Sequence, residues 1–257
     1  MLLAIDIGNT NTTLGIFIND ELKHHWCIST SSQRTSDEIG IMLLSLFQHA
    51  NEDYKLIKDV IICTVVPTIT HSLINAIKKY FNIEPVLVGP GTKTGINIKY
   101  ENPREVGADK IVNAVAALKL YGGSLIIVDF GTATTFCAIN RNRDYLGGVI
   151  CPGITISAEA LFEKASKLPR VEILEPKKII GRTTVTSMQS GMFYGYVGQV
   201  EYIVAEVKKE MHEENIKVIA TGDLANHISS RCHCVDHVNR LLTMYGLKEV
   251  YNMNCVI

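Results

Sequence analysis

The chain has 257 residues, 47% of them hydrophobic, and a near-neutral balance of 25 basic and 26 acidic side chains. That length suffices for one large domain or two compact ones, with the composition of an ordinary globular protein. The charge balance argues against an electrostatic grip on nucleic acid or anionic lipid, so we expect neither as a partner.

The sequence shows no membrane-spanning or signal-peptide pattern, and this together with its cysteine usage favours a cytoplasmic protein. No apolar run approaches the roughly 20 residues that span a bilayer, and Asp6 comes too early for the apolar core of a signal peptide. Seven scattered cysteines do not form the pattern of a disulfide framework. We therefore expect a reducing, cytoplasmic environment.

The first half alternates strand and helix patterns. Apolar runs at 2–7 and 12–18, separated by the turn GNTN, predict a hairpin. Thr35-Ser-Asp-Glu38 is a capping-box pattern, which predicts a helix over 35–50. The other elements predicted in this half are a strand over 59–67 stopped by Pro67, a helix over 69–81, a strand over 85–89, a loop over 89–105 and a helix over 107–120.

The second half begins the same series again. SLIIVDF (124–130) predicts a strand, GTATT a turn, TFCAIN (135–140) a return strand and DYLGGVICPG (144–153) a third strand. A helix over 156–165 follows, then a long helix over about 186–212, which Thr186-Ser-Met-Gln189 opens as a second capping box. KVIATGD (217–223) predicts a late strand.

The two halves repeat one acidic turn. When Asp6 is superposed on Asp129, Gly8 falls on Gly131, Thr12 on Thr135 and Ile16 on Ile139. A period this long is not that of a solenoid and suits two copies of one βββαβαβα-like domain. We expect an α/β fold with halves at 1–115 and 116–257, facing each other across a cleft that both turns line.

The chemistry of these turns suits phosphate. Gly8 permits close approach of an oxygen-rich ligand, and successive backbone N–H groups can form an anion-binding nest. Because a lone carboxylate would repel phosphate, Asp6 is a candidate to hold Mg²⁺, directly or through water. The further donors are the hydroxyls of Thr10, Thr12 and Thr13 and the amides of Asn9 and Asn11. A polar hairpin turn is the alternative, and the second copy of the turn favours the ligand site.

Five motifs in order resemble one family. They are DIGNTNT (6–12), TGINIKYENPREVGADK (94–110), DFGTATT (129–135), GGVICPG (147–153) and GRTTVTSMQSGMFYG (181–195), extended weakly by TGD (221–223). Paired turns of this kind resemble the superfamily of acetate and sugar kinases, heat-shock chaperone ATPases and actin. The motif set more narrowly resembles type III pantothenate kinases. The resemblance implies duplicated ribonuclease H-like (actin-like ATPase) domains, with mixed β-sheets flanked by helices.

The resemblance also implies a reaction and a site. The reaction is transfer of the ATP γ-phosphate to pantothenate, with Mg²⁺ and a monovalent cation (K⁺ or NH₄⁺), by a protein expected to be a homodimer. Asp109 matches the proton acceptor and Asp129 the position that holds the monovalent cation. The ATP positions are Asp6, Ile7, Gly8, Asn9, Thr10, Asn11, Thr12, Thr13 and Thr132. The pantothenate positions are Tyr100, Gly107, Ala108, Asp109, Lys110 and Thr184, the last near a dimer interface.

The residues themselves leave alternatives for several of these positions. Asp109 lies in the first turn of a predicted helix, where a carboxylate stays ionised and can serve as a base or only as a helix-start residue. Lys110 stands where the family usually has Arg, which keeps the charge and loses bidentate geometry. Tyr100 could equally be a core or interface aromatic residue.

Two other functions remain compatible with the sequence. The nearest is a nucleotide-binding regulator of the same fold without catalysis, although the three carboxylates Asp6, Asp109 and Asp129 favour a kinase. A kinase for another acyl or sugar acceptor would share the ATP turns. The group His227, Cys232, Cys234 and His237 suggests zinc, but its Cys-x-Cys spacing is not that of a zinc knuckle. Neither a P-loop nor a Gly-x-Gly-x-x-Gly motif is present.

Overall fold

The structure is a computed structural model that describes residues 1–255. The chain folds into two compact units. The first unit holds residues 1–95, 104–116 and 243 onward, and the second holds 96–103 and 117–242. The division into duplicated domains at 1–115 and 116–257 stays a prediction, because the two units are defined by compactness and not by duplication. The units differ from them at 96–103 and in the return of the chain to the first unit at residue 243.

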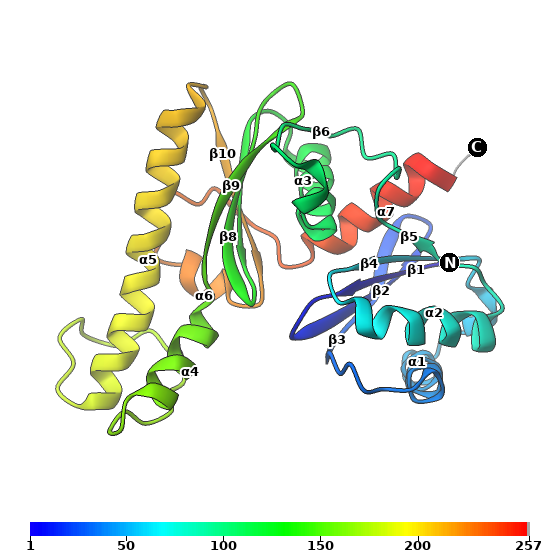
Figure 1. Ribbon diagram of the computed structural model, residues 1–257, viewed down its shortest axis with the longest axis horizontal. Coiled ribbons are helices and arrows are strands. Elements are labelled where there is room, and N and C mark those ends of the chain that lie inside the picture. The colour runs from blue at the N-terminus through cyan, green and yellow to red at the C-terminus, as the bar shows by residue number, and fades with distance from the viewer. Residues whose placement is uncertain (256–257) are drawn as a thin grey trace. The chain divides into compact units, whose positions relative to one another are not determined.

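The first unit is built on a five-stranded mixed sheet in the order β3-β2-β1-β4-β5. β1, β2 and β3 are antiparallel, whereas β4 and β5 run parallel to β1 (Figure 1). The strands are β1 (Leu2–Ile7), β2 (Asn11–Ile18), β3 (Glu21–Ser29), β4 (Asp59–Thr64) and β5 (Val86–Leu87). The helices are α1 (Ser36–Ala50), α2 (Pro67–Phe81), the start of α3 (Ala108–Tyr121) and nearly all of α7 (Leu242–Cys255), with short 3₁₀ turns at Tyr54–Leu56 and Pro103–Glu105.

One face of this sheet is covered by α1 and α2. Apolar residues of β1 alternate with a period of two, so Leu3, Ile5 and Ile7 meet Leu43 of α1 and Ile77 of α2 in one buried cluster. The predicted capping box of Thr35 and Glu38 is confirmed. Pro67 does end the strand region, and it also opens α2 at the first helical position, where its missing N–H costs no hydrogen bond.

The second unit repeats the plan. Its six-stranded sheet has the order β11-β10-β7-β8-β9-β6, with β7, β8 and β9 antiparallel and β10 parallel to β7. Its strands are β6 (Asn97–Ile98), β7 (Leu125–Phe130), β8 (Ala133–Ile139), β9 (Asp144–Pro152), β10 (Lys217–Gly222) and β11 (His237–Val238). Its helices are α4 (Ile154–Lys164), α5 (Thr184–Met211) and α6 (Ala225–Ser229), and α5 covers one sheet face through Phe193, Val200 and Val204.

The duplication is visible in the arrangement of strands. β1 and β7 have the same burial pattern, with the aspartate as the one half-buried residue near the end of each strand. In each unit the first strand pairs antiparallel with the next strand and parallel with a later one. The expected fold of duplicated α/β domains with mixed sheets flanked by helices is confirmed.

The alignment of the return strands needs a correction. Asp6 pairs with Thr13, but Asp129 pairs with Thr135, so Thr135 corresponds to Thr13 and not to Thr12. The second turn is one residue shorter, because the Gly131 N–H bonds to the carbonyl of Ala133, whereas the Gly8 N–H reaches that of Asn11. Thr12 therefore corresponds to Thr134.

Two further sequence expectations differ from the structure. The capping box of α5 lies at Thr183 and Thr186, one turn before the predicted Thr186–Gln189 pair, and Gln189 donates instead to the carbonyl of Glu172. The sequence of β3 contains no apolar run and therefore does not by itself predict a strand. Its residues alternate between half-buried and exposed, and several of them are charged or histidine.

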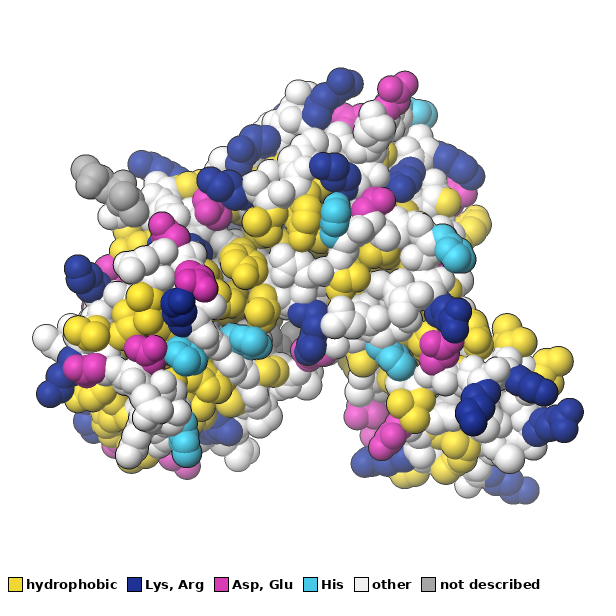
Figure 2. All heavy atoms as spheres, turned by 180° about the vertical axis from the view of Figure 1, so that it is seen from behind, with side chains coloured by type: hydrophobic (Ala, Val, Ile, Leu, Met, Phe, Trp, Pro, Cys, Tyr) yellow, Lys and Arg dark blue, Asp and Glu magenta, His cyan; other side chains and the backbone are white. Residues whose placement is uncertain are grey.

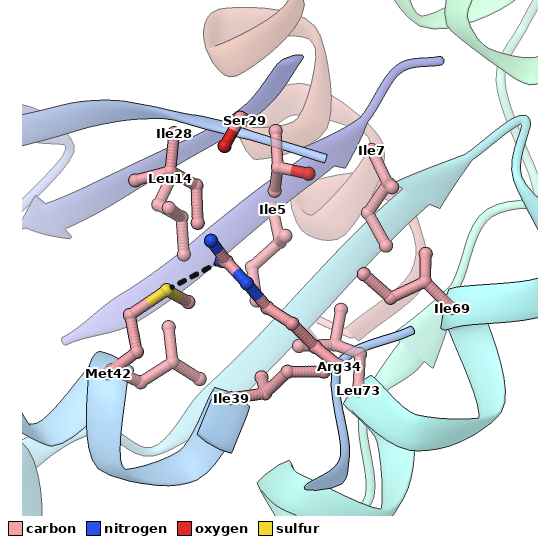
Figure 3. A pocket seen from close by; sticks show the side chains of 12 residues that line it. Ile5, Ile7, Leu14, Ile28, Ser29, Arg34, Ile39, Met42, Ile69 and Leu73 are labelled. Carbon is pink, nitrogen blue, oxygen red and sulfur yellow. Dashed lines mark hydrogen bonds between the residues drawn. The ribbon is translucent and has the colours of Figure 1, made fainter. Parts of the chain in front are cut away.

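A small cavity, mostly apolar, lies between the β1–β2–β3 face and the two helices (Figure 3). The half-buried Arg34 extends into it from the segment after β3 and donates to the Met42 sulfur at 3.1 Å. Thr12 and Ser29 also line it. Ile7 and Thr12, the strand residues that flank the first turn, are thus part of its lining.

On the face drawn in Figure 2, basic and acidic side chains are interspersed, as expected for near-zero net charge. Among residues 1–255, no helix combines the length and apolarity needed to cross a bilayer.

Candidate active site

The first unit places Asp6 in a short row across its sheet. Asp6 of β1 pairs with Thr13 of β2 and, on the other side, with Cys63 of β4. Paired residues of neighbouring strands present their side chains to the same sheet face, so the three share the face opposite the α1–α2 cluster. Ile7, the next residue, points into that cluster, and only its backbone remains on the side of the turn.

The turn after β1 is closed by several short hydrogen bonds. Gly8 N–H donates to the Asn11 carbonyl at 2.9 Å, and Thr30 N–H donates to the Thr10 carbonyl at 2.8 Å. The Thr30 hydroxyl donates to the Gly8 carbonyl at 2.8 Å and also lies 2.8 Å from the Thr12 hydroxyl. Asn9 and Thr10 at the tip are exposed. The Thr12 hydroxyl is thus used inside the unit, and Thr13 remains on the Asp6 side of the sheet.

The Gly107–Lys110 segment forms the start of α3. The Gly107 carbonyl accepts from the N–H groups of Lys110 and Ile111, at 3.0 and 3.4 Å. A Cβ at position 107 would collide with the carboxylate of Asp109, so glycine here lets that carboxylate fold back over the helix start. Lys110 Nζ lies 3.1 Å from Asp109 Oδ2, and both side chains are mostly buried. The residue that replaces the usual Arg therefore pairs with the expected base.

The thiol of Cys63 is influenced by the charges of both Asp6 and Asp109. Its side chain is fully buried, and burial raises the pKa of the thiol well above its usual range. The charges of Asp6 and Asp109, together with a hydrogen bond to Asp6, raise this pKa further, whereas Lys110 lowers it. The two carboxylates expected to hold Mg²⁺-ATP and to accept the proton thus act on one buried thiol.

The second unit holds a corresponding row. Asp129 of β7 pairs with Thr135 of β8 and with Thr221 of β10, and both threonines are buried. Within the described part of the chain, the Thr135 hydroxyl has no hydrogen-bond partner. Gly222 has a φ of +94°, and a Cβ there would lie 2.8 Å from Asp129 Oδ1. This glycine leaves room beside the carboxylate, in a set of oxygen donors that suits a hard cation.

The second turn is packed differently from the first. Thr132 is exposed at its tip. Gly153, the residue after β9, lies so near that a Cβ would collide with the carbonyl oxygens of Gly131 and Thr132. Glycine is therefore required at position 153 by close backbone approach, since its φ of −71° is ordinary.

Tyr100 and Thr184 also belong to the second unit. Tyr100 is partly exposed, and its ring lies about 3.6 Å from where a Cβ of Gly147 would stand. Thr184 is the exposed first residue of α5, directly after its N-cap Thr183. The predicted residues are thus divided between the two units, with Asp6, residues 7–13 and 107–110 in the first and Tyr100, Asp129, Thr132 and Thr184 in the second.

The suggested zinc ligands stand in different surroundings. The His227 ring meets Phe193 edge-on at 5.3 Å, whereas His237 stacks on Tyr121 at 4.7 Å. Burial raises the pKa of Cys232 to about 12 and that of Cys234 to about 11. Within the part of the chain that the structure describes, no three His, Cys, Asp or Glu side chains converge as metal ligands.

Sequence reasoning missed four residues beside these groups: Thr30, Cys63, Thr135 and Gly153, although the last two fall within the family motifs. Thr30 follows β3, and Cys63 is the last but one residue of β4; both strands pair near the first turn. Strand pairing, rather than any motif, reveals them. The weak TGD motif contains Thr221 and Gly222, and the structure places both residues beside Asp129.

Comparisons with known proteins agree with this architecture. A structure from Campylobacter jejuni, provisionally assigned as a Baf family transcriptional activator, matches with a TM-score of 0.59 at 17% identity over 97% of each chain. A provisionally assigned 2-dehydro-3-deoxygalactonokinase from Sinorhizobium meliloti matches with a TM-score of 0.55 at 12% identity, over 100% of this chain and 98% of that one. An inorganic polyphosphate/ATP-glucomannokinase from Arthrobacter sp. strain KM matches with a TM-score of 0.50 at 11% identity, over 97% of each chain.

These structures share the fold with this protein. The sequence model of type III pantothenate kinases matches residues 2–206, which is most of the chain and includes Asp6, Asp109, Asp129 and Thr184. The chain therefore belongs to the type III pantothenate kinase family.

Proposed function

We propose that the protein transfers the γ-phosphate of ATP to the primary hydroxyl of pantothenate, giving 4′-phosphopantothenate, the first step of coenzyme A synthesis. The observation that carries the proposal is the clustering in one unit of Asp6, at the phosphate-type turn, with Asp109, at the start of α3. Family membership supports the reaction class.

Each residue has a role in the proposed reaction. The hydroxyl oxygen of pantothenate forms a bond to the γ-phosphorus while the bond from that phosphorus to the ADP oxygen breaks. The hydroxyl proton passes to Asp109. Residues 7–13 and Thr132 hold the phosphates and nucleotide, and such positioning is the larger part of phosphoryl-transfer catalysis.

The donors at Asp6 and Asp129 fit the proposed cations. Mg²⁺ prefers oxygen ligands such as carboxylates and water, and it would neutralise phosphate charge. The half-buried Asp6 near the end of β1 can provide a carboxylate. Asp129, with Thr135 and Thr221 on the same sheet face, offers only oxygen atoms to K⁺ or NH₄⁺. The buried Thr135 hydroxyl without a partner supports a ligand there.

We assign pantothenate to Tyr100, Gly107–Lys110 and Thr184. Lys110 must share its ammonium group between Asp109 and the pantothenate carboxylate, because the ion pair is already formed. We further propose a homodimer. Among the described residues, a Cβ added at Gly191, Gly195 or Gly198 of α5 would meet no other element within 4 Å. The nearby Ile180 is 80% exposed, so this surface can be covered by a second copy.

The deciding experiment is coupled ADP release with Mg²⁺-ATP and K⁺, with and without pantothenate, and with the product confirmed by mass. Pantothenate-dependent release supports the proposal. ATP binding without pantothenate-dependent release would instead favour a regulator or a kinase for another acceptor.

Replacement of Asp109 tests the base directly. Asp109→Asn should lower turnover by roughly 10²–10⁴-fold while ATP binding persists. Asp37→Asn is the matched control, because Asp37 is likewise a first-turn helix carboxylate of the same unit, paired with Lys79. Equal turnover in Asp109→Asn and wild type would exclude Asp109 as the base.

A further inference from the structure

We propose that Thr30 is the positioning residue of the first phosphate turn, holding its carbonyl groups inward so that the turn presents N–H donors to ATP. This inference rests on the proposed function, since it concerns the same nucleotide turn. Thr30 follows β3 and lies about twenty residues along the chain from the turn that it contacts.

The hydrogen-bond directions around Thr30 can be assigned. A hydroxyl carries one proton, and that of Thr30 is donated to the Gly8 carbonyl. The Thr12 hydroxyl, 2.8 Å away, must therefore donate to Thr30. Thr30 N–H donates to the Thr10 carbonyl. One residue thus contacts the start, the tip and the end of the turn.

These contacts show which carbonyl groups of the turn are engaged within the unit. The carbonyls of Gly8 and Thr10 accept from Thr30, and the carbonyl of Asn11 accepts from Gly8 N–H. Three acceptors that would repel phosphate are consequently engaged within the unit. Backbone N–H groups are the donors that bind an anion at such turns.

The surroundings of Thr30 protect this network. Both hydroxyl contacts are partly buried, and Thr12 lines the mostly apolar cavity between the sheet and the two helices. Limited access of water makes each hydrogen bond harder to replace. A loosened turn would populate its binding-competent shape for a smaller fraction of the time, and apparent affinity falls by that fraction.

Three variants test the inference. Thr30→Val preserves shape and removes the hydroxyl, Thr30→Ser retains it, and Thr35→Val is the matched control. Thr35 lies in the same segment and caps α1 through its hydroxyl, without a contact to the turn among its hydrogen bonds. Loss of that cap should lower stability alone.

Calorimetric titration with Mg²⁺-ATP is the first measurement. Thr30→Val should bind about tenfold more weakly and raise KM for ATP, with KM for pantothenate unchanged. Thr30→Ser should stay within about twofold of wild type, and Thr35→Val should melt earlier with wild-type affinity. Wild-type affinity in Thr30→Val would overturn the inference. If the valine variant does not fold, Thr30→Ala is measured in its place, with the same expected result.

Amide hydrogen exchange in the ligand-free protein separates this inference from the proposed function. The Gly8 amide should exchange at least about fivefold faster in Thr30→Val than in Thr35→Val. If wild type fails to bind ATP, the proposed function is wrong, and exchange alone decides the role of Thr30. Equal exchange in the two variants would then count against it.

Discussion

The two acidic turns are held by opposite means at equivalent positions. Ser29 pairs with Asn11 and Pro152 with Ala133, so the residues that follow, Thr30 and Gly153, correspond to each other. Thr30 binds the first turn through its hydroxyl, whereas Gly153 touches the second through bare backbone. The longer first turn is thus supported by a side chain, and the shorter second turn by close backbone packing.

A consequence of this difference appears one strand away. Thr12 and Thr134 are equivalent and both are buried. The Thr12 hydroxyl bonds to Thr30, but the Thr134 hydroxyl has no partner among residues 1–255, because its unit has glycine where the other has threonine. Duplicated scaffolds can therefore preserve the aspartate and the turn while exchanging the interactions that support them.

The largest expected effect comes from filling the glycine position. Gly153→Ala should lower the free energy of unfolding by about 3 kcal/mol, because the new Cβ collides with two backbone carbonyls that cannot move independently. Gly89→Ala, in the loop after β5 where the Cβ meets open space, should instead raise stability by about 0.4–1 kcal/mol. Urea unfolding of both variants measures the contrast, and equal stabilities would show that the second turn is loosely packed.

An intermediate effect is expected from the two buried threonines. Thr12→Val should cost about 1 kcal/mol by breaking its bond to Thr30, whereas Thr134→Val should gain about 1 kcal/mol by removing an unpaired buried hydroxyl. The difference between the variants, about 2 kcal/mol, is the measured quantity. Destabilisation by Thr134→Val would reveal a hidden partner for its hydroxyl.

The smallest effect concerns pH. Asp6 pairs with Cys63 in the first unit, and Asp129 pairs with Thr221 at the equivalent place in the second. Of these two strand partners, only the cysteine has a side chain that titrates. Because the pKa of the folded thiol is raised, the unfolded chain loses its proton first, and stability falls as pH rises through the unfolded value of about 8.5.

Between about pH 7.5 and about pH 9.0 this loss amounts to at most about 0.8 kcal/mol for one thiol. Cys63→Ser should lose correspondingly less stability than wild type over the same interval, as denaturant unfolding at both pH values will measure. Cys232 and Cys234 are present in both proteins, so their titration cancels. An identical pH dependence would place the Cys63 thiol in contact with water.

Much of the architecture could be predicted from local patterns. Period-two and helical spacing, the Thr35–Glu38 capping box and the repeated Asp-x-Gly turns predicted the main strands and helices and the duplication. The motifs also named residues in both units, among them the paired positions Asp6 and Asp129. The roles of those residues remain predictions.

What could not be predicted depends on strand pairing over long sequence distances. Nothing in STSSQ marks Thr30, whose role exists only once β3 has paired with β2. The one-residue difference between the turns is likewise invisible when Asp6 is superposed on Asp129, because both alignments of the threonines look equally good. Cys63 reads as one more buried strand residue until its neighbours are known.

The return of the chain at α7 has a consequence for synthesis. Tyr251 of α7 donates to Asp59 at 2.6 Å, Thr243 to Asn113 at 2.8 Å, and Gly246 lies against the Val112 carbonyl, so α7 completes the first unit. A ribosome makes residues 1–116 long before residues 243–255. The nascent first unit must therefore wait, with the α7-facing part of α3 uncovered, until the entire second unit has been translated.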